Sequence, residues 1–253
     1  MMRCLLLLLA LAGTALSVNS IEQDFTCPFD SHTWRQRMEI SASPKGMRLD
    51  LRQFGDVIQP PTLPQCPKCR AVLFMEKFDD RTVEKLRPFV LGRDFQQTAE
   101  KYPSYYLLAL IQEWTKAPPI FIGHSYLKAS WQLEQKPNAM RQSLERSHVH
   151  LSKAFASMKR GDAEFVNTAL LLGELEMRLG RFDAAKERFQ ALRDAEPFKE
   201  PGFQKIIQRE LELITASESG PRSIDEKLDA AALEPFAVLP ESETNKATKP
   251  GKK

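Results

Sequence analysis

The sequence predicts a mainly α-helical fold of stacked helical hairpins, preceded by a small β module. Three observations support this. Apolar side chains recur at helical spacing through residues 82–216. One stretch in this region has the 34-residue period of a helix–turn–helix repeat. Three of the four cysteines lie between residues 18 and 80, where helical patterns are few. With 253 residues, 42% of them hydrophobic, the chain is long and apolar enough to bury a core.

The clearest repeat signal lies in residues 166–199. Its key positions are Leu172, Gly173, Gly180, Phe182, Ala185, Phe189 and Pro197. Gly173 and Ala185 would let two helices approach closely, and Gly180 would permit the turn between them. This stretch resembles the tetratricopeptide (TPR) repeat. Because one such repeat cannot bury its apolar face alone, we expect TPR-like stacked hairpins on both sides of it.

Helical periodicity and proline or glycine breaks divide the rest of the region into segments. We expect helices at 94–101, 104–116, 121–135, 138–159, 162–179, 182–195 and 202–216. The last of these carries an apolar stripe that suits a helix closing the array, formed by Phe203, Ile206, Ile207, Leu211 and Ile214. The TPR-like helical domain is therefore predicted to span 81–216.

The two ends of the chain look different from the middle. Arg3 precedes an apolar run from Leu5 to Leu16, and Ala15 and Ser17 suit a cleavage site. This order is typical of a signal peptide at 1–17, with an uncleaved anchor or a misplaced start as alternatives. The run is too short to span a bilayer core of ~30 Å. We therefore expect an exported, periplasmic protein with no transmembrane span in the mature chain, ending in a flexible polar tail at 217–253.

Residues 18–80 contain two cysteine turns, Cys27-Pro-Phe-Asp30 and Cys66-Pro-Lys-Cys69. They look like a zinc ribbon, in which two Cys-Pro-x-Cys turns present thiolates to one metal ion. Asp30 stands in place of the second cysteine of the first turn, and His32 follows two residues later. The candidate metal ligands are thus Cys27, Cys66 and Cys69, with Asp30 or His32 as the fourth, and structural Zn²⁺ as the candidate metal.

Other interpretations of these cysteines stay open. The ribbon could be metal-free, Cys27 could form a disulfide with Cys66 or Cys69, or Cys66 and Cys69 could be a redox pair. A redox pair usually begins a helix after a buried strand. Here prolines precede the pair and the strand-like run 71–75 follows, which favours a metal turn. Short strands are expected at 38–41 and 47–51, around a turn at 43–46.

Paired Cys-Pro-x-Cys turns followed by TPR-like helices resemble a bacterial family of unknown function. The resemblance covers roughly residues 24–200. It implies structural ligand roles for Cys27, Cys66 and Cys69, and it implies no activity. The aspartate at position 30, where the family pattern has the fourth cysteine of the two turns, departs from that pattern.

Composition and motifs exclude some classes of function. The net charge of +3 comes from 36 basic and 33 acidic residues, which are interleaved, so we do not expect nucleic-acid binding. No nucleophile elbow, phosphate-binding loop or H-E-x-x-H motif is present. We expect a non-enzymatic protein-binding or assembly module that binds a protein partner through the concave helical face or the ribbon. The alternative is a periplasmic thiol-redox or metal-handling protein acting through Cys66 and Cys69.

Overall fold

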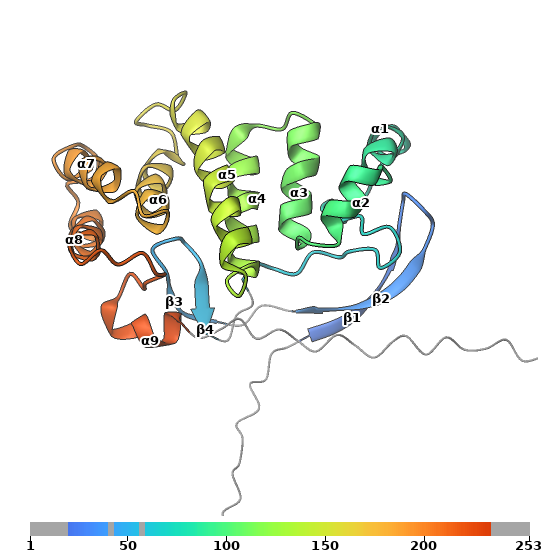
Figure 1. Cartoon of the computed structure of the whole chain (residues 1–253), viewed down its shortest axis with the longest axis horizontal. Helices are drawn as coiled ribbons and strands as arrows, with labels where there is room; N and C mark the ends of the chain where they lie inside the picture. The colour runs from blue at the N-terminus through green and yellow to red at the C-terminus, as the bar shows by residue number, and fades with distance from the viewer. Residues whose placement is uncertain (1–19, 40–42, 56–58, 234–253) are drawn as a thin grey trace, which may run out of the picture.

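The structure is a computed structural model that describes residues 20–39, 43–55 and 59–233. Within these residues, two β-hairpins precede a succession of paired helices (Figure 1). The predicted fold class is confirmed: the chain is mainly helical, with a small N-terminal β module that carries the cysteines. No helix of the described part is long and apolar enough to cross a membrane. The expected signal peptide lies outside the described residues.

The β module consists of two antiparallel hairpins. Strand β1 (Ser20–Thr26) pairs with β2 (Thr33–Glu39), and β3 (Pro44–Met47) pairs with β4 (Gln53–Gly55). The predicted pairing of 38–41 with 47–51 is therefore wrong. Met38 pairs with Ile21 of β1, and residues 48–52 form the loop between β3 and β4. The alternation in 47–51 reflects burial of this loop, as described below.

The helices follow the β module in sequence order. They are α1 (Asp80–Val90), α2 (Arg93–Ala99), α3 (Ser104–Trp114), α4 (Pro119–Gln132), α5 (Pro137–Phe155), α6 (Phe165–Arg178), α7 (Phe182–Arg193) and α8 (Pro201–Thr215). Helix α1 was not among the predicted segments. Its N-terminus is capped by the Asp79 carboxylate, which accepts a hydrogen bond from the Thr82 N–H. Val83, Leu86 and Val90 form its buried face.

The close crossing predicted for the repeat is confirmed. A Cβ atom on Gly173 of α6 would lie 2.4 Å from the Phe189 ring of α7, so only glycine permits this approach. Gly180 has φ +75° and forms the turn between the two helices. A second crossing of this kind joins α4 and α5, where a Cβ on Gly123 would lie 2.6 Å from the Leu151 side chain.

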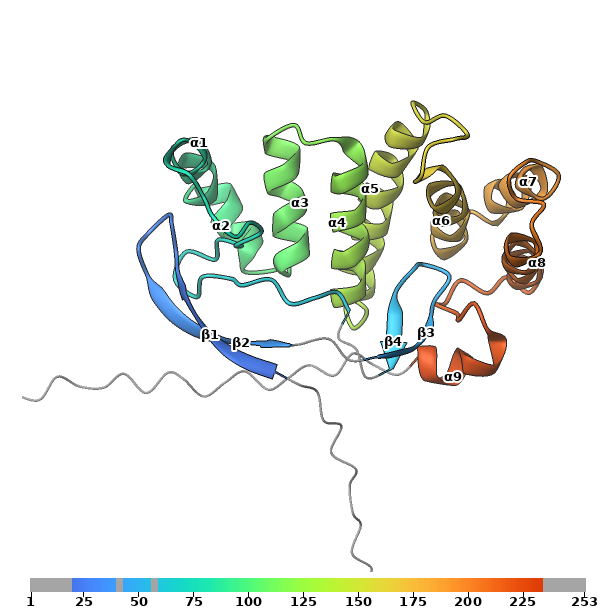
Figure 2. The same cartoon turned by 180° about the vertical axis from the view of Figure 1, so that it is seen from behind.

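The described part of the predicted tail, residues 217–233, packs against the β module. Residues 217–233 return to the β module, where the Leu49 N–H donates to the Arg222 carbonyl and the Ile224 N–H donates to the Met47 carbonyl. A short 3₁₀ helix (Glu226–Leu228) and α9 (Asp229–Ala232) follow. Figures 1 and 2 show α9 beside β3 and β4. Apolar Ala232, which is buried, helps to fix this segment. The remainder of the expected tail lies outside the described residues.

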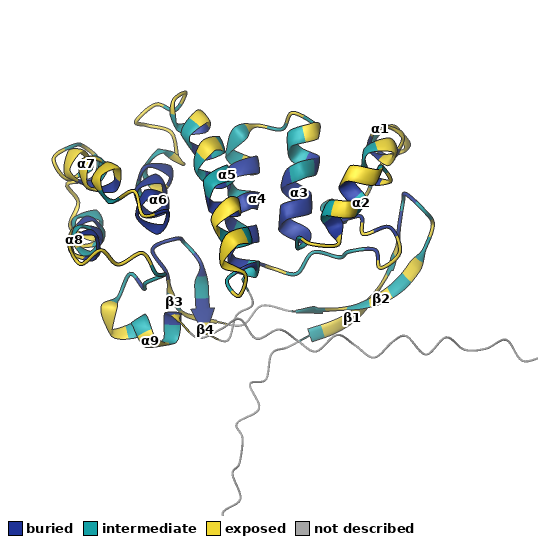
Figure 3. Ribbon diagram, in the orientation of Figure 1, coloured by how far each residue is buried: buried dark blue, intermediate teal, exposed yellow. Residues whose placement is uncertain are grey.

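The two hairpins lie on the same side of the helical array, β1–β2 near α1 and α2 and β3–β4 near α9 (Figures 1 and 2). Residues of the buried class lie on the facing surfaces of consecutive helices and in the loop between β3 and β4 (Figure 3). The β module takes part in two apolar clusters: the cysteines lie in one with α1 to α3, and Leu49 of the β3–β4 loop lies in another with α6 to α8.

Candidate metal centre

The first cysteine turn connects β1 to β2. The Cys27 N–H donates to the His32 carbonyl (2.8 Å), and the Ser31 N–H donates to the Cys27 carbonyl (2.9 Å). Ser31 has φ +60°, in the left-handed region, which reverses the chain within few residues. The turn places the side chains of Cys27 and Asp30, three residues apart, on the same side.

The second turn repeats this backbone. The Cys66 N–H donates to the Ala71 carbonyl and the Arg70 N–H donates to the Cys66 carbonyl, each at 2.9 Å. Arg70 has φ +59°. Bond for bond, the two turns match, with Cys66 in the place of Cys27 and Cys69 in the place of Asp30. The Cys69 N–H also points at the Cys66 sulfur (3.5 Å), as expected of a turn that presents a thiolate.

The two turns bring four ligand groups together, which we call the cysteine–aspartate cluster: Cys27, Asp30, Cys66 and Cys69. One ligand atom from each lies within 4.8 Å of all the others. The Cys27 and Cys69 sulfurs are 3.4 Å apart, and both Asp30 oxygens are 3.8 Å from the Cys66 sulfur. A tetrahedral Zn²⁺ with Zn–S bonds of ~2.3 Å requires sulfur–sulfur edges of ~3.8 Å. The cluster could therefore hold a metal ion such as Zn²⁺.

Without a cation beside them, the buried Cys27 and Cys69 thiols keep their protons. All three cysteines are buried and none forms a disulfide. Burial raises the pKa of the Cys27 thiol to about 11 and also raises the pKa of Cys69. Burial would raise the pKa of Asp30 as well, but hydrogen bonds from the His32 N–H and from the thiols keep it below its ordinary value. Metal binding would displace the thiol protons and compensate the buried negative charge.

His32, the other candidate for the fourth ligand, has a different place. Its backbone N–H donates to Asp30 Oδ1 at 3.0 Å. Its ring lies nearly parallel to that of Trp34, with centroids 6.5 Å apart. It is not part of the group of ligand atoms, so the structure brings together four of the five predicted candidates. His32 orients the carboxylate through its backbone.

Helices α1 and α2 support both turns. Arg87 of α1 donates to the carbonyls of Pro28 and Phe29 in the first turn. Gln96 of α2 donates to the Cys69 carbonyl at 2.7 Å. Phe29 is buried and belongs to the same apolar cluster as the three cysteines and the inner faces of α1 and α2. The sequence reasoning missed Arg87 because it did not predict α1, although the Asp79 cap and the apolar spacing of Val83 and Leu86 mark that helix.

Comparison with known families adds one finding. A family model described as "Uncharacterized protein conserved in bacteria (DUF2225)" matches residues 63–214, more than half of the chain. The chain belongs to the DUF2225 family. Neither a curated protein nor a solved structure matches it. The DUF2225 match includes Cys66 and Cys69 and the helices around them, but it begins after Cys27 and Asp30.

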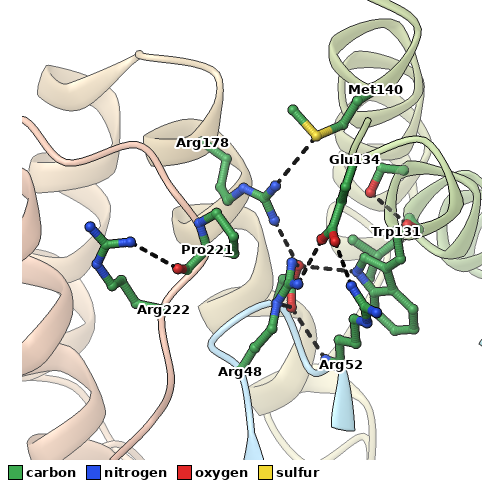
Figure 4. Close-up of polar contacts among 11 residues, drawn as sticks. Arg48, Arg52, Trp131, Glu134, Met140, Arg178, Pro221 and Arg222 are labelled. Carbon is green, nitrogen blue, oxygen red and sulfur yellow. Dashed lines mark hydrogen bonds and ion pairs between the residues drawn. The ribbon is translucent and has the colours of Figure 1, made fainter. Parts of the chain in front are cut away.

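The helical part of this DUF2225 protein contains a second polar cluster that sequence reasoning missed. The Asp50 carboxylate, fully buried in the β3–β4 loop, accepts hydrogen bonds from Arg48 (2.6 Å), Arg178 (2.7 Å) and Trp131 (3.1 Å). Glu134, after α4, accepts from Arg48 and Arg52 at 2.6 Å each (Figure 4). We call this group the Asp50 cluster. Ion pairs thus join the loop to α4 and α6.

Apolar side chains of the same loop fill the spaces beside these ion pairs. Leu49 lies in the apolar cluster of α6, α7 and α8, and Leu51 packs against the cluster of α4, α5 and α6. The loop therefore occupies the side of the array formed by α4, α6 and α8, the first helices of successive hairpins. The expected partner-binding surface on the helices or the ribbon stays a prediction, and the packing of this loop shows which side of these helices the chain itself covers.

Two more carboxyl groups lie beside the Asp50 cluster. Glu174 of α6 and Glu210 of α8 are both buried, and they interact with each other. Burial raises the pKa of Glu174 to about 8, against the opposing effect of Arg178, and burial together with Glu174 raises the pKa of Glu210 well above its ordinary value. A buried pair of this kind holds a proton at neutral pH, which removes the repulsion between two carboxylates at the joint between the two helices.

Proposed function

We propose that this DUF2225 protein is an exported, non-enzymatic protein-binding or assembly module whose cysteine–aspartate cluster holds a structural Zn²⁺. The observation that carries the metal assignment is the pair of matching turns. Two backbones of the same conformation, 39 positions apart as counted from Cys27 to Cys66, direct four ligand atoms to within 4.8 Å of one another. Chance placement of buried polar groups does not give two equivalent turns.

A structural role suits the surroundings of the cluster. Structural zinc sites are closed by four protein ligands, whereas catalytic sites keep a position for water. The cluster offers four groups, and the three cysteines are 0–6% exposed. A two-stranded hairpin such as β1–β2 is marginal on its own and needs a staple. The ion would join the end of this hairpin to the turn in front of α1.

A protein-binding role is supported by the architecture and by exposed apolar side chains. Stacked helical hairpins commonly act as extended binding surfaces. Large apolar side chains remain exposed on or near three consecutive helices, namely Trp114, Phe121 and Val149. These side chains lie on helices α3, α4 and α5, and we place the partner-binding surface on these helices.

The redox alternative through Cys66 and Cys69 has less support. Reactive cysteines have a lowered thiol pKa and some exposure. Here the pKa of Cys69 is raised and both residues are buried. A sulfur–sulfur contact of 3.4 Å joins Cys69 to Cys27 of the other turn, so Cys69 is not set apart with Cys66 as a pair.

Metal analysis with thiol titration tests the structural site. Purified full-length protein should contain about one zinc per chain, and its thiols should react with a disulfide reagent only after a chelator is added. Asp30→Ala should lower the zinc content and His32→Ala should keep it. Protein free of metal that catalyses disulfide reduction would contradict the proposal and favour the redox alternative.

Export is tested separately by N-terminal sequencing of protein produced in a bacterial host. Cleavage after Ser17 gives a mature chain that begins at Val18 and is recovered from the periplasmic fraction. Recovery of the uncleaved chain from the cytoplasm would contradict export without affecting the metal site.

A further inference from the structure

We propose that Asp30 makes the metal site exchangeable, with the carboxylate as the ligand past which Zn²⁺ enters and leaves. This inference rests on the proposed zinc site and concerns its kinetics. A site of four buried thiolates would retain its ion, whereas this site would take up and release Zn²⁺ with the supply around it.

The first reason is access. Cys27, Cys66 and Cys69 are 1%, 0% and 6% exposed, and the apolar side chains of α1 and α2 close the cluster on the inner side. Asp30 is only partly buried, and its neighbour across the cluster, Lys68, is exposed. Among the four ligand groups, the carboxylate is therefore the one next to solvent, and an ion that leaves past it does not have to disturb the apolar cluster.

The second reason is the donor chemistry. A thiolate and a carboxylate carry the same charge, so the replacement of cysteine by aspartate leaves the formal charge of the site unchanged. What changes is the donor atom. Soft thiolates select zinc, while carboxylate oxygens suit harder ions such as Mg²⁺ and Ca²⁺. The Asp30 position is thus the weakest of the four bonds to Zn²⁺.

The third reason is that the carboxylate is held in place by the backbone. The His32 N–H donates to Asp30 Oδ1 at 3.0 Å, and this bond belongs to the turn itself. One oxygen therefore keeps a partner when the ion departs, while both oxygens stay 3.8 Å from the Cys66 sulfur. The site remains formed for the next ion, which is what reversible exchange requires.

The rate of zinc release to a chelating dye tests this. Zinc-loaded full-length protein is mixed with excess 4-(2-pyridylazo)resorcinol, and the coloured zinc complex is followed with time. Asp30→Cys, which completes a four-thiolate site, should slow release by about tenfold or more, and Asp30→Asn should speed it by a similar factor. Asp24→Asn is the matched control, because Asp24 lies on β1 and is exposed; its release rate should equal that of the wild type.

Cobalt substitution gives a second readout that does not depend on kinetics. The sulfur-to-cobalt charge-transfer bands of the Co²⁺ protein should strengthen in Asp30→Cys and shift in Asp30→Asn. Equal release rates for the wild type and Asp30→Cys would overturn the exchange proposal while leaving a structural zinc site intact. A cobalt spectrum unchanged by Asp30→Asn would overturn it as well, even if Asp30→Cys fails to fold. Wild-type protein that binds neither ion would instead refute the proposed zinc site.

Discussion

The two polar clusters of this protein differ in how their charges are compensated. In the Asp50 cluster, arginine side chains surround each carboxylate, and Asp50 alone accepts hydrogen bonds from Arg48, Arg178 and Trp131. In the cysteine–aspartate cluster, three thiols and a carboxylate face one another without an arginine among them. Buried charge must be paired or bind a metal. The first cluster is therefore complete as a joint within the fold, and the second could hold a metal ion.

The largest expected effect is the loss of bound zinc when one ligand of the cysteine–aspartate cluster is removed. Cys66→Ser replaces a fully buried sulfur ligand, so zinc per chain should fall from about one to below ~0.1, measured by native mass spectrometry. The helical signal in circular dichroism should persist, because α4 to α8 pack in apolar clusters that contain no cysteine. Ser31→Gly, in the other turn, is the control: it relieves a positive φ and should keep the metal. Zinc retained in Cys66→Ser would refute the ligand set.

The next largest effect should be a loss of folding stability when Asp50 is removed from the Asp50 cluster. Asp50→Ala leaves Arg48 and Arg178 buried without their carboxylate, which should lower the free energy of unfolding by ~3–5 kcal/mol. Urea unfolding followed by circular dichroism measures this, and the zinc content should not change. Asp24→Ala removes an exposed carboxylate from its pair with Arg35 and should have no measurable effect. If Asp50→Ala cost as little as Asp24→Ala, the loop would not be anchored as described.

The same contrast explains what could be predicted from the sequence. The cysteine turns are local patterns: a Cys-Pro-x-Cys spacing fixes the backbone of its own turn, so Cys27, Asp30, Cys66 and Cys69 could be grouped without a structure. The close α6–α7 crossing at Gly173 and Phe189 is also local, since both residues belong to one repeat. The choice between Asp30 and His32 required coordinates, because it depends on which of the two side chains the turn directs toward the three sulfurs.

The Asp50 cluster could not be predicted because its partners are far apart in sequence. Asp50 and Arg178 are separated by 128 positions, and Arg48 and Glu134 by 86. The alternating residues 47–51 were predicted to form a short strand, but a loop inserted between helices gives the same alternating pattern. There, Leu49 and Leu51 pack while the charged residues between them form ion pairs. The same part of the chain also holds residues 217–233 in place, because Leu49 and Met47 form backbone hydrogen bonds with Arg222 and Ile224.

A larger side chain at Gly173 of α6 should lower the stability of the fold by an intermediate amount and leave the cysteine–aspartate cluster unaffected. Gly173→Ala places a Cβ atom 2.4 Å from the Phe189 ring, so α6 and α7 must move apart and the free energy of unfolding should fall by ~1–3 kcal/mol. Because α6 carries Arg178 and Glu174, the shift acts on the Asp50 cluster and leaves zinc binding unchanged. Gly202→Ala in α8 is the control, since no atom lies within 4 Å of the added Cβ. Equal melting temperatures for Gly173→Ala and the wild type would contradict the close crossing.

The smallest expected effect is that folding stability and zinc binding depend on pH in opposite directions. The pKa of Glu174 is raised from its ordinary value of 4.5 to about 8 in the folded protein, where Glu210, Asp50, Arg178 and Arg48 face it. Between these two pH values the folded state binds more protons than the unfolded state, so helical stability should fall as pH rises from 4.5 to 8. Zinc binding should change in the opposite direction, because the thiols must lose protons to bind the ion. Acid should therefore weaken the metal site and strengthen the helical joint.

Glu174→Gln should remove much of this slope and stabilise the protein at pH 8 by ~1–2 kcal/mol, measured by urea unfolding of the zinc-loaded protein at several pH values. Glu176→Gln, two residues further along α6, is a matched control of opposite sign. Burial would raise the pKa of Glu176, but hydrogen bonds from Arg188 and His148 lower it to about 2, so its charge stabilises the fold above pH 4.5 and that stabilisation is lost as pH falls toward 2. Its removal should therefore destabilise the protein at neutral pH. If both variants shifted stability in the same direction, the two carboxyl groups would not differ in protonation as their surroundings require, and the Glu174–Glu210 pair would not be a protonated joint.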